Sequence, residues 1–244
     1  MNWKIIKYIL RKITFFLWFL PRKCPICGMR LFRFFPFKIS SSYGGYKLTD
    51  WLCPGCSSHP RHRNLWLFLH RKTEIFQWDK AFFLHIAPDR CFVEIFAKIF
   101  KNYLTADLYK TNVMVKMDIT NIGYQNESFD IIFCLHVLEH IPDDNKAISE
   151  LYRVLKKEGI AVIMVPQTKE LETYEDWSIT SPDGRLKAFG QHDHVRRYGQ
   201  DFLLKLQKAG FIVSVIKQDN YLSGKEIKKY IGTKYNGDIF ICKK

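Results

Sequence analysis

Hydrophobic residues follow two alternating patterns along the last two thirds of the chain. Short runs rich in Ile, Phe and Val predict strands buried on both faces, because they are too short for typical helices. Between these runs, apolar residues recur at helical spacing. The predicted strands cover 81–87, 103–108, 113–118, 129–137, 160–165, 211–217 and 238–242, and the predicted helices cover 64–76, 90–101, 142–159 and 200–209. This alternation predicts an α/β fold with a doubly wound, mostly parallel sheet.

The stretch 128–167 shows both patterns in one unit. Phe129–Val137 predicts a buried strand, and the segment that follows Pro142 predicts a helix with acidic residues in its first turn. Lys156 and Gly159 predict the end of that helix, since cations and a trailing glycine are typical of helix C-termini. A second apolar run follows at once, so the stretch predicts two parallel strands joined by a right-handed crossover.

The same stretch carries a family resemblance. FDIIFCLHVLEH followed by LYRVLKKEGIAVIMVP resembles the fourth and fifth strand region of class I methyltransferases that use S-adenosylmethionine (SAM). It is most similar to the broad type 11-like group, although Glu158-Gly159 stands where that group often has a glycine pair. The resemblance covers about residues 80–217 and implies a Rossmann-like fold, SAM as cofactor and methyl transfer as the reaction.

Strand ends supply the candidate cofactor residues. The turn 85–90 lacks the glycine-rich loop typical of the family, although Ala87 is small and a helix N-terminus follows. Asp107 could accept both ribose hydroxyls, and the resemblance implies that Asp118 accepts from the adenine amino group. A strand-end cap is the alternative for either aspartate. The residues expected at the cofactor site are His85, Ala87, Pro88, Asp107, Leu108, Asp118, Ile119 and His136.

The segment after the fifth predicted strand supplies the candidate catalytic residues. Its polar part, 168–190, predicts a lid over the site. His194, and second to it His192, are candidates for the base that a hydroxyl acceptor needs. Arg196 is expected to bind an anionic group of the substrate. A structural network that fixes the lid is the alternative for each, and Glu139-His140 could cap the turn after the fourth strand.

Four of the seven cysteines form two CxxC pairs, separated by 25 residues: Cys24, Cys27, Cys53 and Cys56. Two such knuckles can place four sulfurs in a tetrahedral array, which suits structural Zn²⁺. His59 or His62 could replace one ligand, and two redox pairs are a further alternative. The odd cysteine count argues against a secreted disulfide framework and favours a reducing cytoplasm.

The basic charge is concentrated in the first third of the chain. Residues 1–80 hold 15 Lys/Arg and 3 Asp/Glu, a net charge of +12, whereas residues 81–244 hold 23 and 21, a net charge of +2. This asymmetry indicates an anionic partner, either membrane phosphates or nucleic acid, or else a solvated basic face. Arg61, His62 and Arg63 could face the cofactor or an acidic substrate group, or be plain surface charge.

Residues 1–23 predict a basic helix rich in aromatic side chains. Its uncharged run, Ile13–Pro21, falls short of the roughly 20 residues needed to cross a bilayer. The helix is therefore expected to lie on an anionic membrane surface through residues 1–20. Docking on the protein's own core is the alternative.

The sequence thus predicts three parts: a basic helix (1–23), a zinc-binding module (24–63) and a methyltransferase domain (64–244). The expected function is SAM-dependent methylation of a hydroxyl or amine on a small molecule, sugar or lipid-linked glycan, at the inner membrane face. An RNA methyltransferase that uses the basic zinc module is the alternative, although the NPPY-type signature is absent after the fourth strand. A non-catalytic scaffold is a third possibility, supported by the glycine-free turn.

Overall fold

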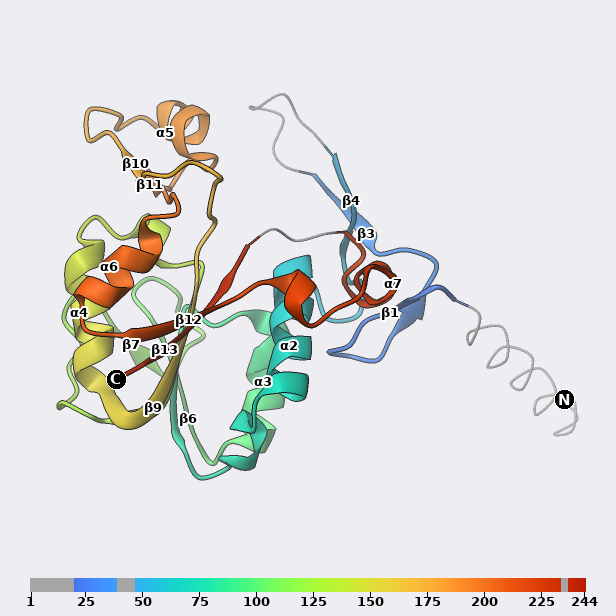
Figure 1. Ribbon diagram of the computed structural model, residues 1–244, viewed down its shortest axis with the longest axis horizontal. Coiled ribbons are helices and arrows are strands. Elements are labelled where there is room, and N and C mark those ends of the chain that lie inside the picture. Colours follow the sequence, from blue (N-terminus) through green and yellow to red (C-terminus); the bar gives the residue numbers. More distant parts are fainter. Residues whose placement is uncertain (1–19, 39–46, 234–236) are drawn as a thin grey trace, which may run out of the picture. The chain divides into compact units, whose positions relative to one another are not determined.

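The computed structural model describes residues 20–38, 47–233 and 237–244, and it divides the chain into two compact units (Figure 1). The first unit comprises residues up to Lys72 together with Tyr221–Tyr235, and the second comprises Thr73–Asn220 with Asn236–Lys244. The boundary predicted after residue 63 therefore differs from this division. The helix that follows the second CxxC pair belongs to the first unit, and so does a late segment of the chain.

The described part of the first unit contains two small antiparallel sheets and one long helix. Its elements are β1 (Arg22–Lys23), β2 (Arg30–Leu31), β3 (Phe35–Lys38), β4 (Lys47–Leu52), α2 (Pro60–Lys72), α7 (Gly224–Glu226) and η5 (Ile227–Ile231). The β3–β4 pair is the hairpin expected between the two CxxC motifs, and its predicted turn lies outside the described residues. Helix α2 begins four residues earlier than predicted, because Pro60 suits the first position of a helix.

The late segment packs against α2 within this unit. The Tyr221 hydroxyl donates to Asn64 Oδ1 at 2.6 Å, and Arg71 forms an ion pair with Glu226 at 2.9 Å. An apolar cluster joins the two pieces of chain: Leu67, Leu222, Ile227 and Ile231. Residues that follow β12 in the sequence therefore complete the module that contains the cysteines, which the sequence analysis did not predict. The predicted helix over 1–23 lies almost wholly outside the described residues.

The second unit is built on a seven-stranded sheet with the order β12-β13-β9-β8-β5-β6-β7. The bounds are β5 (Phe82–Ile86), β6 (Asn102–Asp107), β7 (Val115–Lys116), β8 (Phe129–Leu135), β9 (Leu155–Met164), β12 (Ile212–Ile216) and β13 (Ile239–Lys243). Strands β5 to β9 pair in parallel, and β13 runs antiparallel to both of its neighbours. The predicted α/β, doubly wound, mostly parallel sheet is confirmed. The third predicted strand is much shorter than expected.

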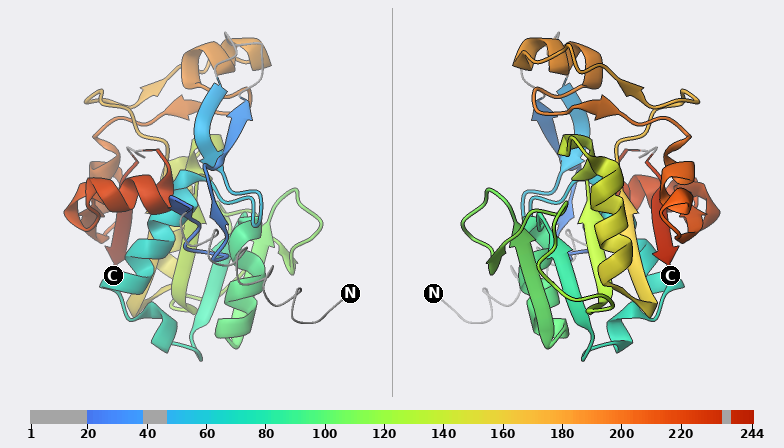
Figure 2. Two further views of the ribbon diagram at one scale, coloured as in Figure 1. Left: turned by 90° about the vertical axis from the view of Figure 1, so that its right-hand side faces the viewer. Right: turned by 90° about the vertical axis from the view of Figure 1, so that its left-hand side faces the viewer.

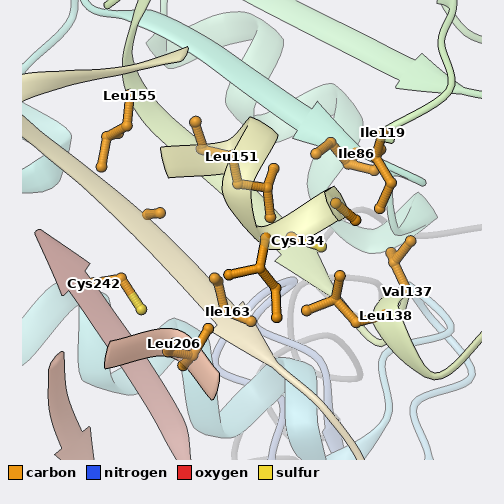
Figure 3. Packing of buried hydrophobic residues seen from close by; sticks show 14 of the residues in the cluster. Ile86, Ile119, Cys134, Val137, Leu138, Leu151, Leu155, Ile163, Leu206 and Cys242 are labelled. Carbon is orange, nitrogen blue, oxygen red and sulfur yellow. The ribbon is translucent and has the colours of Figure 1, made fainter. Parts of the chain in front are cut away.

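Helices cover both faces of this sheet, as the two views of Figure 2 show. Helix α3 (Arg90–Ile99, green) lies on one face and α4 (Asp144–Val154, yellow-green) on the other. Side chains alternate along each strand, so Phe83 and Phe133 contact the aromatic residues of α3. On the opposite face, Leu151 of α4 and Leu206 of α6 (Phe202–Lys208) lie among buried strand residues (Figure 3).

Helix α4 ends earlier than predicted. The helix stops at Val154, and Lys156 and Gly159 belong to strand β9. Lys156 Nζ binds both carboxylate oxygens of Asp130 on β8 at 2.9 Å. A Cβ at Gly159 would lie 3.0 Å from the Asp130 carbonyl oxygen. Both residues therefore serve strand pairing rather than a helix C-terminus.

The predicted lid segment has more structure than expected. It contains β10 (Tyr174–Glu175), which pairs with β11 (Arg196–Arg197), and helix α5 (Pro182–Phe189). Ser181 caps α5 by accepting from Gly184 N, and Gly190 ends it at φ 91°. Short 3₁₀ helices complete the unit: η2 (Ile75–Gln77), η3 (Leu138–His140) and η4 (Gln218–Asn220). Among all described residues, no helix is long and apolar enough to cross a membrane.

Candidate functional site

The strand order creates a switch point between β5 and β8 in the second unit. From β5 the chain continues to β6 on one side, whereas β8 and β9 lie on the other side. In open α/β sheets, ligands bind outside the carboxyl ends of the strands at such a point. Ala87 directly follows β5 and His136 directly follows β8, so these two residues flank the expected site.

Both flanking residues have unusual backbone conformations. Ala87 has φ 47° and His136 has φ 56°, in the left-handed region that side-chain-bearing residues seldom occupy. Such conformations cost on the order of 1 kcal/mol or more and cluster at functional sites. The Ala87 N–H donates to the Ala106 carbonyl at 2.7 Å, and the His136 N–H donates to the Met164 carbonyl at 2.7 Å. Each bend is therefore fixed to the adjacent strand.

The turn after β5 lacks the expected glycine but has the conformation that a glycine normally provides. Ala87 takes the left-handed conformation, and Pro88 and Asp89 lead into α3, which begins at Arg90. Asp89 stands at the N-cap with extended backbone. The N-terminus of α3 thus follows the turn directly, as required for polar ligand groups to meet its backbone N–H groups.

Asp107 ends β6 and is largely buried. Its Oδ1 accepts from the backbone N–H groups of Tyr109 and Lys110 at 2.8 and 2.9 Å. Burial alone would raise the pKa of Asp107, but these two N–H groups and the Lys110 ammonium together hold that pKa below its ordinary value. An ionised carboxylate with its loop already fixed can still accept ribose hydroxyls, so the cap and the cofactor roles are compatible here.

Asp118 and Ile119 follow β7, which ends at Lys116. Asp118 is exposed and accepts from the Thr120 backbone N–H and hydroxyl at 2.8 Å, whereas Ile119 is buried. Leu108, directly after Asp107, exposes 41% of its surface. A carboxylate that accepts hydrogen bonds, next to apolar side chains that can pack against a base, suits a nucleoside.

The structure places His85 elsewhere than predicted. Its side chain is fully buried on the α3 face of the sheet, where its Nδ1 lies 2.8 Å from the Tyr103 hydroxyl. Aromatic rings surround it, including those of Phe83 and Phe133. The structure therefore places His85 in the hydrophobic core rather than at the carboxyl edge, because alternate strand residues face the layer of helices.

Polar side chains gather where β8 ends. His136 Nδ1 lies 3.3 Å from Glu139 Oε1, and His140 Nδ1 lies 3.3 Å from Asp193 Oδ2. The rings of His140 and His194 meet edge to face at 4.7 Å. Burial would raise the pKa of Glu139, but its contacts with His136 and His140 hold that pKa below the ordinary value. Burial lowers the pKa of His194.

The segment with the predicted catalytic residues is fastened onto this cluster. The Val195 N–H donates to the Glu139 carbonyl at 2.9 Å, and this contact brings His194 next to Glu139. His194 is buried, whereas His192 is exposed and lies outside the cluster. From their sequence context, Glu139 and His140 were expected only to cap the turn after β8. Their proximity to His194 depends on a loop contact that no local pattern reveals.

The structure also gives Arg196 a role other than the predicted one. Its side chain is 1% exposed and donates to the backbone carbonyls of Leu138, Ile141 and Pro142. It also pairs with Glu175 at 2.5 Å. Burial would lower the pKa of Arg196, but Tyr198, Glu175 and Asp144 raise it above the ordinary value. All of these partners belong to the protein, so the guanidinium braces the loop after β8 instead of binding substrate.

The first unit brings its four predicted cysteine ligands together. Cys24 Sγ lies 3.7 Å from Cys56 Sγ, and Cys27 Sγ lies 3.6 Å from Cys53 Sγ. All four sulfurs lie within 4.8 Å of one another. Four thiolates around one Zn²⁺ at about 2.3 Å would stand about 3.8 Å apart, so the donor set fits a tetrahedral structural site. Burial raises the pKa of Cys27 to about 11, which a bound cation would oppose.

Near the start of α2, the basic residue Arg63 is internal to this unit. Arg63 is fully buried and donates to the carbonyls of Ser58, Trp51 and Ile231. Burial lowers the pKa of Arg63 to about 10, against the opposing effect of the neighbouring cysteines. Arg63 is therefore not a surface charge, and it is not a ligand for the cofactor, although its sequence context had suggested these two roles.

The two histidines near the second CxxC pair are not part of the sulfur cluster. His59 Nδ1 accepts from Trp51 Nε1 at 3.1 Å, and His62 Nδ1 accepts from the His59 backbone N–H at 3.1 Å. Among the described residues, the group that could hold a metal in this unit consists of the four cysteines alone.

Comparison with known proteins supports the fold of the second unit. The seven-stranded, mostly parallel sheet has the Rossmann-like fold that class I SAM-dependent methyltransferases share. Residues 90–163 match the protein family described as a methyltransferase domain. This match covers part of the second unit, and the four-cysteine module lies outside it.

Two solved structures share the fold. A SAM-dependent methyltransferase from Archaeoglobus fulgidus is 15% identical, with a TM-score of 0.52, over 78% of this chain and 96% of that one. A SAM-dependent methyltransferase from Mesorhizobium loti is 12% identical, with a TM-score of 0.50, over 74% and 98% of the two chains. An uncharacterized protein from Methanocaldococcus jannaschii is 29% identical over 75 residues, which span 30% of this chain and 33% of that protein.

Proposed function

We propose that the second unit binds SAM at the β5–β8 switch point and transfers its methyl group to a hydroxyl of a small molecule, sugar or glycan. The observation that carries the proposal is the pair of left-handed residues, Ala87 and His136, on either side of that point. Folded proteins keep two such conformations only where the surrounding structure fixes them, and the strand order independently selects the same place for a ligand.

Different residues at the carboxyl edge of the sheet would bind different parts of the proposed cofactor. The turn at Ala87 and the N-terminus of α3 would hold its polar methionine end, and Asp107 would accept from the ribose hydroxyls. Asp118, Leu108 and Ile119 would surround the adenine. When bound, SAM would supply a methyl group on a sulfonium. The acceptor oxygen would form the new C–O bond and lose its hydroxyl proton to solvent, and the electron pair of the broken C–S bond would stay on sulfur.

The protein's own contribution is alignment and exclusion of water. The loop after β8 and the segment around His194 are held together by the Val195–Glu139 hydrogen bond and by Arg196. Their buried polar groups lie beside the switch point and would hold the polar group of the acceptor. The four cysteines of the first unit would hold one structural Zn²⁺. Contact of residues 1–20 with an anionic membrane stays a prediction.

The acceptor class can be tested with SAM that carries a labelled methyl group, incubated with extract from cells that lack the gene. We expect label in small molecules or glycans that survives ribonuclease and is stable to mild base, as an ether is. The Asp107→Asn variant should transfer at least about 10-fold less, because it loses charge-assisted hydrogen bonds to the ribose. Label that disappears with ribonuclease would instead identify RNA as the acceptor. No label from a protein that binds the cofactor would favour the scaffold.

A further inference from the structure

The polar cluster above β8 contains three potential metal ligands. The ligating atoms of Glu139, His140 and His194 all lie within 4.8 Å of one another. Two ligands at about 2.1 Å from one ion stand at most about 4.2 Å apart, so small side-chain movements would close the set. A carboxylate and two imidazoles are the donors that first-row transition metals prefer, unlike the oxygen-only sets of Ca²⁺ and Mg²⁺.

The hydrogen bonds around the two imidazoles leave the same nitrogen available on each. His194 Nδ1 lies 3.2 Å from the Phe189 carbonyl oxygen, so Nδ1 carries the proton and Nε2 carries the lone pair. His140 Nδ1 faces the Asp193 carboxylate at 3.3 Å. Metal-binding histidines almost always donate their second N–H to a carbonyl or a carboxylate in this way. Both rings are therefore held as metal ligands usually are.

Two of the three ligands carry a buried polar atom that no described residue satisfies. Glu139 is 1% exposed and its Oε2 has no hydrogen-bond partner in the described chain. His194 is 4% exposed, and its Nε2 likewise lacks one. Leaving a buried acceptor unsatisfied costs about 1–3 kcal/mol, and more for a charged group. One cation between these atoms would satisfy both.

From these contacts we propose that Glu139, His140 and His194 bind a divalent transition-metal ion, separate from the four-cysteine site. The loop after β8 and the segment around His194 are already held together by the Val195–Glu139 hydrogen bond and by the three carbonyls that Arg196 binds. The catalytic role of this metal ion rests on the proposed function. An ion at the end of β8 would bind the acceptor oxygen and lower the pKa of its hydroxyl, whose proton passes to solvent. His194 then acts as a ligand rather than as the base.

Mn²⁺ is a selective probe of this site. It is the weakest binder in the divalent series and prefers oxygen and nitrogen donors, so it will not displace Zn²⁺ from four thiolates. Titration of the full chain loaded with one Zn²⁺ per molecule, which the four thiolates take first, with free Mn²⁺ followed by electron paramagnetic resonance, is expected to show one bound Mn²⁺ per chain. His194→Ala and Glu139→Gln should each weaken binding at least about 100-fold. Asp193→Asn, which removes the partner of His140, should weaken it about 10-fold.

The matched control is His192→Ala, which removes an exposed histidine two positions from His194 and should leave Mn²⁺ affinity unchanged. Asp193 is half exposed, so its variant folds even if the buried variants do not. Calorimetric binding of the demethylated cofactor to the same samples reports separately on the proposed function. Absence of Mn²⁺ binding to the wild type, or equal affinity in wild type, His194→Ala and Asp193→Asn, would overturn the site.

Discussion

Replacing Cys53 with serine is expected to release zinc from the first unit and to unfold that unit. Cys53 is fully buried, and its sulfur lies 3.6 Å from that of Cys27. Structural zinc in small modules contributes about 10–16 kcal/mol of binding free energy that is also folding free energy. The described strands of this unit are two to six residues long, and small units of this kind depend on their metal for folding. The measurement is zinc content per chain, with limited proteolysis of residues 20–72.

Cys91→Ser supplies the control for this prediction. Cys91 is a buried cysteine on α3 of the second unit and lies outside the sulfur cluster. Its substitution should cost some stability but retain one zinc and leave the first unit resistant to protease. If Cys53→Ser keeps its zinc and the same proteolytic pattern, the four cysteines do not form the structural site described here.

Arg196→Met is expected to lower the stability of the second unit by about 3–5 kcal/mol, the usual cost of breaking a buried, hydrogen-bonded charge network. Three backbone carbonyls after β8 would lose their donor, and Glu175 would lose its 2.5 Å partner. For a unit of this size the melting temperature should fall by about 10 °C, measured by differential scanning calorimetry.

Arg197→Met is the matched control, since Arg197 is the adjacent residue of β11 and is only partly buried. Its guanidinium lies over the Tyr174 ring at 5.8 Å, a contact worth about 1 kcal/mol at most. Equal melting temperatures for the Arg196→Met variant and the wild type would contradict the bracing role. They would return Arg196 to the substrate-binding role that its sequence suggested.

The sheet could be predicted from sequence because its strands are short apolar runs with clear boundaries. The C-terminal end of α4 could not be predicted, because it depends on the contact between Lys156 and Asp130 on the neighbouring strand. Local composition makes Lys156 and Gly159 look like a helix C-terminus. Partners distant in the chain decided that boundary, as they did the extension of the first unit by Tyr221–Tyr235.

The candidate site shows the same limit. The positions of Asp107 at the end of β6 and of Asp118 two residues beyond β7 could be predicted, because apolar runs mark both strands. His85 was misplaced because the sequence does not show that its side chain faces the core. The left-handed conformation of Ala87 was also hidden, since it depends on the link to Ala106 in the next strand. Helix α5 could have been found from Ser181-Pro182 and Gly190, which are ordinary start and stop signals.

The central claim is that the β5–β8 switch point binds the SAM skeleton, and calorimetric titration with S-adenosylhomocysteine tests it most directly. We predict micromolar affinity for the zinc-loaded wild type, and affinity at least about 10-fold weaker for Asp107→Asn. The amide oxygen of that variant still accepts from Tyr109 and Lys110, so the loop is kept. Asp79→Asn changes a carboxylate before β5, at the opposite edge of the sheet, and should bind as the wild type does. No binding by the wild type, or equal affinity in all three proteins, would contradict the account.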